Sequence, residues 1–341
     1  MTSNNGDGAD KSLSRRAMFG RMAAAATVAG TLPLIANAQP AARPAPAPAP
    51  PPQAMKQGGN GPIRVLFISS FHPFDRENLF LALDSMGDDI TWTHVEHPAA
   101  ELFYDPRAAK KFDVYLFYDA FAGRETKPNS RDFVDTVPTA EMQANLKQLM
   151  QNGDKGFVFF HHALASWTHT WPAGVNGSNA YVEMMGGAAD WGTPLKNIRG
   201  KDYPASGYRQ GTEQFVSVVD KTHPITQGLG DGFDIVDETY LCPMFEDSVH
   251  CLLRTDFVPT ADKFQHAPGS THVGPGHVPG STMSAWVKTA ERSPIVYIQH
   301  GHDVVAWVNP KWRLLMSNAI KWAASPESKA WAHANPKRIF V

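Results

Sequence analysis

Short, mostly apolar runs recur along the chain after residue 60. Four of them have the length and the hydrophobic character of strands that are buried on both faces of a parallel sheet. They occupy residues 64–69, 90–95, 114–118 and 157–160. The pattern therefore predicts a sheet whose inner strands are covered by other layers.

Two stretches between these runs carry apolar residues at helical spacing instead. Asp75 can cap the first, which ends near Met86, and Pro138-Thr139 begins the second, which Gly153 ends. The resulting β-α-β-β-α-β order predicts an α/β fold in which helices layer the sheet. The buried stripes are Leu79, Leu83 and Met86 in the first helix and Met142, Leu146 and Leu149 in the second.

The second half of the chain mixes strands with one long irregular segment. Asn309-Pro310 predicts a helix that ends near Ala324, because proline is favoured in the first helical turn. Residues 257–282 are rich in Gly, Pro and His without periodicity, so we expect a long loop. We assign residues 61–326 to one domain and residues 327–341 to a C-terminal tail. Predicted strands lie at 215–219, 233–236, 249–253 and 295–299.

Residues 1–38 have the parts of an export signal. Paired arginines at 15–16 precede an apolar stretch at 22–36, and Ala36 and Ala38 stand where a signal peptidase cleaves. The stretch is shorter than the ~20 residues of a transmembrane helix, so we expect cleavage and no stable membrane span. The arginines resemble a twin-arginine (Tat) signal and favour it over an ordinary Sec signal, although Met18 stands where that motif prefers Phe. The expected location is the periplasm or another exported compartment.

Residues 39–60 form a Pro/Ala-rich linker that contains seven prolines. Alternating proline blocks helix and sheet hydrogen bonds and favours extended polyproline II. The linker is either a semi-rigid spacer or a segment without a role, and the sequence leaves both interpretations open.

Composition narrows the choice of partners. The 341 residues carry a formal net charge of −2, and after residue 60 there remain 25 basic and 31 acidic residues. The domain is therefore mildly acidic, and nucleic acid is not an expected partner. Two cysteines cannot build a disulfide framework or a four-thiolate metal site. The composition leaves open whether the protein forms a homo-oligomer.

Histidines and carboxylates follow three of the predicted strands. Ligands of open α/β sheets bind beyond the carboxyl ends of the strands, so these side chains are candidates for one site. His161, Glu238 and His302 suit either a divalent metal or acid/base chemistry. The segments are His161-His162, Asp237-Glu238-Thr239-Tyr240 and Gln299-His300-Gly301-His302-Asp303.

Each candidate also has a structural interpretation. We expect only one of His161 and His162 to line a pocket, because adjacent residues that leave a strand point in opposite directions. One of the carboxylates at 237–238 is a base or a metal ligand, or both belong to a solvated acidic corner of the surface, and the sequence favours neither interpretation. Trp167 either lines a flat, sugar-like ligand or packs under a loop together with neighbouring aromatic residues. The loop histidines His266, His272 and His277 are expected to form no dedicated metal site.

Several separated blocks resemble the ThuA-like (trehalose utilisation) family, in the right order from about Ile63 to Ala324. The similarity implies a flavodoxin-like layered sheet with helices on both faces, as in class I glutamine amidotransferases. Those enzymes carry a cysteine after the equivalent strand, whereas this chain has His161-His162 there, so amidotransferase chemistry is not implied. The matching blocks are Gly156 to Trp167 with Trp171, Tyr181 and Gly186-Gly187, then His223-Pro224-Ile225-Thr226 with Gly228-Leu229, Asp237 to Tyr240, Tyr297 to Asp303, and Asn309-Pro310 with Ala319 to Ala324.

The resemblance implies work on a sugar or keto-glycoside. We expect an exported enzyme that uses acid/base or metal-assisted chemistry without a cysteine nucleophile. The alternative is a non-catalytic domain that binds a carbohydrate or another small ligand. The expected catalytic residues are His161, His162, Glu238 and His302, with His161, Glu238 and His302 as candidate ligands of a divalent metal, and the expected substrate-binding residues are Trp167, Asp237, Tyr240 and Gln299.

Overall fold

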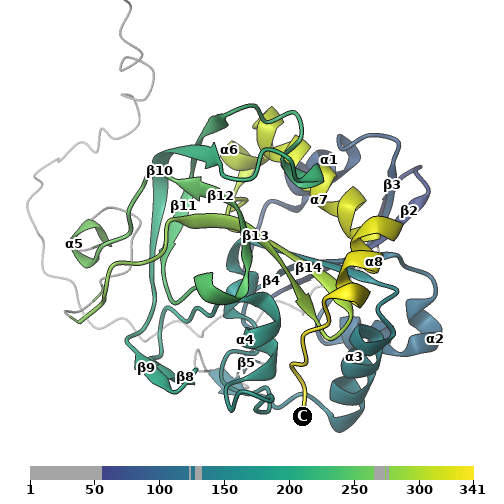
Figure 1. Cartoon of the computed structure of the whole chain (residues 1–341), viewed down its shortest axis with the longest axis horizontal. Coiled ribbons are helices and arrows are strands. Elements are labelled where there is room, and N and C mark those ends of the chain that lie inside the picture. The colour runs from purple at the N-terminus through teal and green to yellow at the C-terminus, as the bar shows by residue number, and fades with distance from the viewer. Residues whose placement is uncertain (1–55, 123, 127–132, 265–272, 274–275) are drawn as a thin grey trace, which may run out of the picture. The chain divides into compact units, whose positions relative to one another are not determined.

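Ten strands form one mixed sheet at the centre of the structure, which is a computed structural model (Figure 1). The structure describes residues 56–122, 124–126, 133–264, 273 and 276–341. Among these residues the strand order is β1-β3-β2-β4-β7-β14-β13-β12-β10-β11. The α/β fold with a large layered sheet is thus as the sequence predicts.

The half of the sheet from β3 to β14 is parallel. Counted along the chain, these five strands lie in the order 2-1-3-4-5, so their carboxyl ends meet at one edge. All four runs predicted in the first half of the chain, and the predicted run at 295–299, are strands. The parallel strands are β2 (Ile63–Ser70), β3 (Ile90–Glu96), β4 (Val114–Asp119), β7 (Gly156–Phe160) and β14 (Ser293–Ile298).

The other half of the sheet is antiparallel. The sequence pattern misses β13, whose eight residues are all buried although they include a lysine. The antiparallel half consists of β10 (Gly207–Val218), β11 (Gly232–Leu241), β12 (His250–Thr255) and β13 (Met283–Ala290). At the opposite edge of the sheet, β1 (Lys56–Gly59) pairs antiparallel with β3. Two short hairpins, β5 (Arg124–Thr126) with β6 (Phe133–Asp135) and β8 (Leu195–Ile198) with β9 (Lys201–Tyr203), lie outside this sheet.

The two strands β10 and β11 form a long ribbon that leaves the sheet. β10 pairs with β11 over most of its length, but it pairs with β12 only from Val216 to Val218. We call the part of β10 before Val216, together with its partner residues in β11, the free part of the ribbon. An irregularity in register lies within it, between Arg209 and Thr212, and such irregularities bend a strand. The free part reaches the end of β7, where the ring of Tyr240 contacts the ring of His161.

Helices cover both faces of the sheet (Figure 1). Successive residues of β2 enter opposite hydrophobic clusters, Val65 and Phe67 on one face and Leu66 and Ile68 on the other, as a doubly covered strand requires. One cluster contains residues of α1 (Arg76–Asp84), α6 (Val304–Trp307) and α7 (Pro310–Ala324). The other contains residues of η2 (Ala99–Tyr104), α2 (Pro106–Ala109), α3 (Ala140–Asn152), η3 (His161–Ala165) and α4 (Ala180–Met185).

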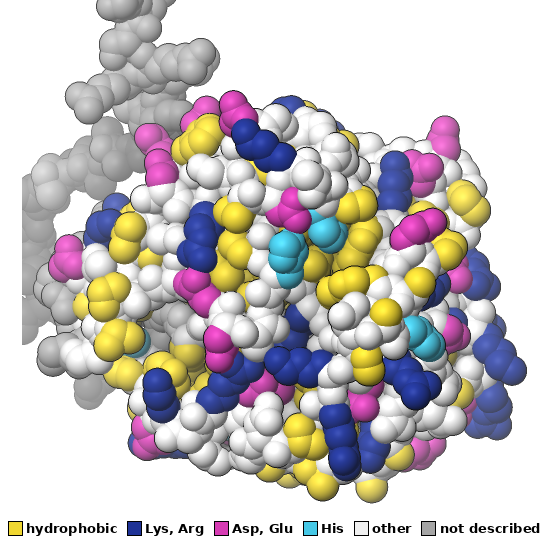
Figure 2. All heavy atoms as spheres, viewed as in Figure 1, with side chains coloured by type: hydrophobic (Ala, Val, Ile, Leu, Met, Phe, Trp, Pro, Cys, Tyr) yellow, Lys and Arg dark blue, Asp and Glu magenta, His cyan; other side chains and the backbone are white. Residues whose placement is uncertain are grey.

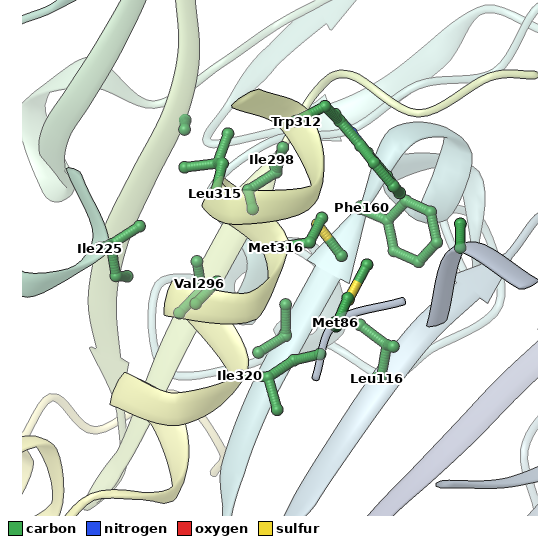
Figure 3. Close-up of a cluster of buried hydrophobic side chains, with 14 of the residues drawn as sticks. Met86, Leu116, Phe160, Ile225, Val296, Ile298, Trp312, Leu315, Met316 and Ile320 are labelled. Atoms are coloured by element: carbon green, nitrogen blue, oxygen red, sulfur yellow. The ribbon is translucent and has the colours of Figure 1, made fainter. Parts of the chain in front are cut away.

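The predicted helix boundaries follow from their capping residues. The side chain of Asp75 accepts a hydrogen bond from the amide of Asn78 at the start of α1, and Thr139 accepts one from Met142 at the start of α3. Gly153 ends α3 in the left-handed conformation that glycine favours. Figure 3 shows α7 packing its apolar stripe, including Leu315 and Met316, over the sheet.

The structure differs from the predicted layout at both ends of the domain. Lys56–Gly59, expected to end the linker, forms β1, where a side chain on Gly58 would collide with the ring of Trp92. Beyond residue 326, α8 (Pro326–Ala334) packs on the sheet, and Ile339 and Phe340 are buried in the second cluster. The remaining elements are η4 (Pro224–Thr226), η5 (Glu246–Ser248) and α5 (Ala261–Phe264).

Several sequence predictions concern residues that the structure does not describe. The export signal at 1–38, nearly all of the linker, and the loop histidines His266 and His272 lie outside the described ranges. Part of the predicted loop at 257–282 is described, and it includes the short helix α5.

Two leucines of α1 provide a test of the packing. Leu83 is 1% exposed and Leu81 is 58% exposed, although both lie on the same helix. We expect Leu83→Ala to lower the free energy of unfolding by about 2–5 kcal/mol, because it leaves a cavity in the core. Leu81→Ala should change it by less than about 0.5 kcal/mol. Urea denaturation of both variants checks the prediction, and equal losses would contradict it.

Candidate functional site

The carboxyl edge of the parallel strands gathers three potential metal ligands from distant parts of the sequence. His161 follows β7, His302 follows β14, and Glu238 comes from the free part of the β10–β11 ribbon. Their ligand atoms all lie within 4.8 Å of one another, the only such group among the described residues. The three residues proposed from their strand ends therefore meet in space.

A strained turn fixes the ring of His161. This residue has a φ of 53°, in the left-handed region that side chains seldom adopt, and it is fully buried. Its Nδ1 lies 2.9 Å from the carbonyl oxygen of Gln299. The hydroxyl of Tyr297 donates to the backbone carbonyl oxygen of His161 at 2.7 Å. Because a carbonyl oxygen only accepts, Nδ1 carries the proton and Nε2 presents a lone pair.

The lone pair of His161 points into a small polar cluster. Its Nε2 lies 2.6 Å from the hydroxyl of Tyr240, 2.9 Å from Nδ1 of His302 and 3.4 Å from Oε1 of Glu238. The same carboxylate oxygen lies 3.7 Å from Nδ1 of His302. We call these four residues the His161 cluster.

The buried carboxylate of Asp237 holds the cluster together. It accepts hydrogen bonds from the backbone amides of Gly301 at 2.6 Å, His302 at 3.1 Å and Glu238 at 2.8 Å. Asp237 thus joins the ribbon to the turn after β14. It positions the backbone of both neighbouring members of the cluster.

Burial sets the protonation of the cluster. Removal from water lowers the pKa of His161 to about 3 and that of His302 to about 4, since it disfavours the charged imidazolium. Burial likewise raises the pKa of Glu238, while the nearby His302 acts in the opposite direction. Both imidazoles are therefore neutral at neutral pH, which is the form that binds metals or accepts protons.

Three further residues surround the cluster, and the sequence analysis missed them. The ring of His72 lies 5.6 Å from that of His302, and the hydroxyl of Tyr118 donates to the carbonyl oxygen of His302 at 2.7 Å. Nε2 of Gln210 lies 3.4 Å from Nε2 of His302. A signal for His72 was available, because it follows the carboxyl end of β2 as His161 follows that of β7.

The other predicted site residues take different positions. The ring of His162 packs on that of Tyr118 with centroids 4.1 Å apart, outside the metal-ligand group. Gln299 contributes its backbone carbonyl to His161, while its side-chain amide donates to Thr239. Trp167 is 3% exposed, and its ring packs against those of His97 and Trp171.

A second group of buried polar side chains lies around Trp167. Its indole nitrogen, the ring nitrogens of His97, the carboxylate of Asp119 and the hydroxyls of Tyr104 and Tyr181 make no hydrogen bond of ordinary geometry within the described residues. Nε2 of His97 lies 3.9 Å from the carboxylate of Asp119. Burial raises the pKa of Asp119 to about 7. The folded protein therefore keeps this carboxyl group mostly protonated below about pH 7.

Neither cysteine belongs to the His161 cluster. Both are free thiols, and burial raises the pKa of Cys242 to about 12, which suppresses the thiolate. The turn after β7, where an elbow-type enzyme presents its nucleophile, holds His161 instead.

A sequence profile described as ThuA, trehalose utilisation, matches residues 80–323. The chain belongs to the ThuA family. The match spans β7, the ribbon and β14, so all members of the His161 cluster fall within it. No match was found among curated proteins.

Solved structures of similar fold include two ThuA-like proteins. One, from Parabacteroides merdae, is 15% identical, with a TM-score of 0.53 and coverage of 77% of this chain and 90% of the other. One from Bacteroides uniformis is 17% identical, with a TM-score of 0.47 and coverage of 81% and 94%. At 15% identity, the likeness to the Parabacteroides merdae protein concerns the fold alone.

On the face in Figure 2, acidic and basic side chains are interspersed. No helix among the described residues combines the length and the hydropathy needed to span a bilayer.

The carboxyl group of Asp119 predicts a pH-dependent stability. With a pKa of about 7 when folded and about 4 when unfolded, it retains a proton in the folded state that the unfolded chain releases between these values. Because the folded state binds more protons than the unfolded state in this range, the free energy of unfolding falls as the pH rises from 4 to 7. We expect Asp119→Asn to gain stability over the wild type across this range, by up to about 4 kcal/mol.

Urea denaturation at pH 4.5, 6 and 7.5 measures this difference. Asp154→Asn serves as the control, since the side chain of Asp154 is 59% exposed. Parallel pH profiles for Asp119→Asn and wild type would mean that Asp119 is already ionised in the folded state.

Proposed function

We propose that this ThuA-family protein is an exported enzyme that processes a sugar or keto-glycoside by metal-assisted or acid/base chemistry, without a cysteine nucleophile. The observation that carries the proposal is the spacing of the ligand atoms in the His161 cluster. The family supports the substrate class, since its description is trehalose utilisation.

The spacing fits a small divalent cation. Ligands bound at about 2.1 Å in tetrahedral geometry lie about 3.4 Å from one another. The three separations among His161 Nε2, His302 Nδ1 and Glu238 Oε1 are 2.9, 3.4 and 3.7 Å. Two imidazole nitrogens and one carboxylate are also a common ligand set for catalytic zinc and for other transition metals.

The supporting contacts suit metal ligands as well. The hydrogen bond from His161 Nδ1 to the carbonyl oxygen of Gln299 fixes the tautomer and aims Nε2 at the centre of the cluster. Asp237 fixes the backbone of His302 and Glu238. A bound cation would polarise a substrate oxygen or lower the pKa of a bound water molecule.

Tyr240, Glu238 and Gln210 can also act without a metal. Burial raises the pKa of Tyr240 well above its usual value, so its hydroxyl stays protonated and can donate to a substrate oxygen. Glu238, whose pKa burial raises, can exchange a proton with substrate. Gln210, next to His302, supplies an amide for a hydroxyl group of the substrate.

The paired arginines at 15–16 and the apolar stretch at 22–36 support export by the Tat route, with a periplasmic location. The 2-1-3-4-5 order of the parallel strands supports a flavodoxin-like core, to which the antiparallel strands are added.

Metal binding tests the first part of the proposal. We expect the purified chain to bind Zn²⁺ or Mn²⁺ at one site, and His302→Ala to weaken that binding at least about 100-fold, since one of three protein ligands is lost. His333→Ala is the matched control, because His333 lies on α8 outside the metal-ligand group. Isothermal titration gives both affinities, and equal affinity in wild type and His302→Ala would contradict the assignment.

Turnover tests the second part. We expect a screen of glycosides and keto-glycosides to yield product with the wild type, and His302→Ala to abolish turnover while circular dichroism shows an intact fold. Retained activity in this variant would overturn the role of His302. Stoichiometric metal without any turnover would instead favour the alternative, a non-catalytic carbohydrate-binding domain.

A further inference from the structure

We propose that four aromatic side chains beside the His161 cluster bind the C–H face of a pyranose ring. The four are Phe71, Phe121, Trp191 and Tyr208, and we call them the aromatic rim. This inference rests on the proposed function, and it names where and how the sugar would be held.

The rim lies at the same edge of the sheet as the His161 cluster. Phe71 follows β2, Phe121 follows β4, Trp191 precedes β8, and Tyr208 lies at the start of β10. Four separate segments of the chain thus contribute one aromatic side chain each.

Ring contacts join the rim into one surface. Phe71 and Phe121 lie 5.6 Å apart, Phe121 and Trp191 5.4 Å, and Trp191 and Tyr208 6.1 Å, with all three pairs nearly perpendicular. Trp191 also lies 5.3 Å from the ring of Tyr240, the residue whose hydroxyl contacts His161. A ligand on the rim would therefore reach the cluster directly.

The rim differs from the aromatic residues of the core in exposure. Four tryptophans of the described structure are among its most deeply buried side chains, whereas Trp191, Phe121 and Tyr208 are half-buried and Phe71 is 42% exposed. Partly exposed aromatic side chains that touch one another beside a polar cluster are typical of a ligand site.

The backbone at the rim is strained. Phe71 has a φ of 57° and Phe121 a φ of 51°, which is rare for bulky residues. With the φ of 53° at His161, the turns after β2, β4 and β7 all contain such a residue. Strained positions of this kind gather at functional sites, where the surrounding structure maintains them.

A pyranose ring matches what the rim offers. The C–H groups on a sugar face carry slight positive charge and pack on the negative face of an aromatic ring, while the hydroxyls point outward to polar groups. The indole nitrogen of Trp191 is buried and has no hydrogen-bond partner among the described residues, so it can donate to one hydroxyl. Gln210 and His302 supply further polar atoms nearby.

Sugar binding by the full chain tests this inference without requiring turnover. The probes are methyl α-glucopyranoside and trehalose, with sorbitol as a hydroxyl-rich molecule that lacks a ring face. We expect tryptophan fluorescence to report binding of at least one of the two sugars, and Trp191→Ala to weaken it roughly 3- to 10-fold. Trp191→Phe should retain most of the affinity, and sorbitol should bind more weakly than either sugar.

Two further variants keep the test decisive. Phe71→Ala removes the most exposed ring of the rim without opening a buried cavity, and we expect it to weaken sugar binding by a smaller factor, even if Trp191→Ala fails to fold. Phe215→Ala is the matched control, since Phe215 is 39% exposed near the far end of β10. Isothermal titration replaces fluorescence wherever a tryptophan is changed.

The outcomes separate this inference from the proposed metal site. Unchanged sugar affinity in both rim variants, or no binding of either sugar by the wild type at concentrations up to about 50 mM, would overturn the rim. Zn²⁺ affinity should be the same in wild type, Trp191→Ala and Phe71→Ala. Sugar binding that depends on the rim in a chain that binds no metal would support the rim and contradict the metal site.

Discussion

The carboxylate of Asp237 is the contact on which the arrangement of the site depends. It lies in the ribbon of β10 and β11, yet it accepts the backbone amides of Gly301 and His302 in the turn after β14. Both partners are buried backbone donors that would cost free energy if they were left unpaired, about 1–3 kcal/mol each. The contact therefore ties two parts of the sheet that its strand order keeps apart.

Strand order alone would separate the members of the site. Five strand spacings lie between β7 and β11, which corresponds to about 24 Å across a flat sheet. The free part of the ribbon closes this distance, so that Tyr240 lies 2.6 Å from His161. The antiparallel half of the sheet is thus the part of the fold that completes the site, while the parallel half supplies the edge on which it is built.

The sequence predicted the parts of this arrangement that depend on local rules. Asp75, Thr139 and Gly153 mark helix ends because capping is a property of a few adjacent residues. His161 and His302 were found because strand ends of a parallel sheet share an edge, a rule that needs no further detail of the fold.

The parts it did not predict depend on contacts between distant segments. The ribbon contains an irregularity in register between Arg209 and Thr212 that the hydrophobic pattern does not reveal, so the contact of Glu238 with His161 does not follow from that pattern. Trp191 lies in a loop, whereas Trp167, the aromatic residue predicted from the sequence, is buried and packs against His97 and Trp171. Aromatic residues in loops are positioned by tertiary packing, which a single sequence does not reveal.

The charge balance of the His161 cluster connects the fold with the proposed chemistry. Burial favours neutral His161 and His302 and raises the pKa of Glu238, because it penalises the charged form of each group. A divalent cation at its centre would reverse the shift at Glu238 and leave the imidazoles neutral, because the positive charge stabilises the carboxylate. The buried carboxyl of Asp119 experiences the same desolvation, but it lies outside the metal-ligand group of the described residues. Burial alone therefore does not make a metal site, and the spacing of two imidazoles and one carboxylate is what distinguishes the His161 cluster.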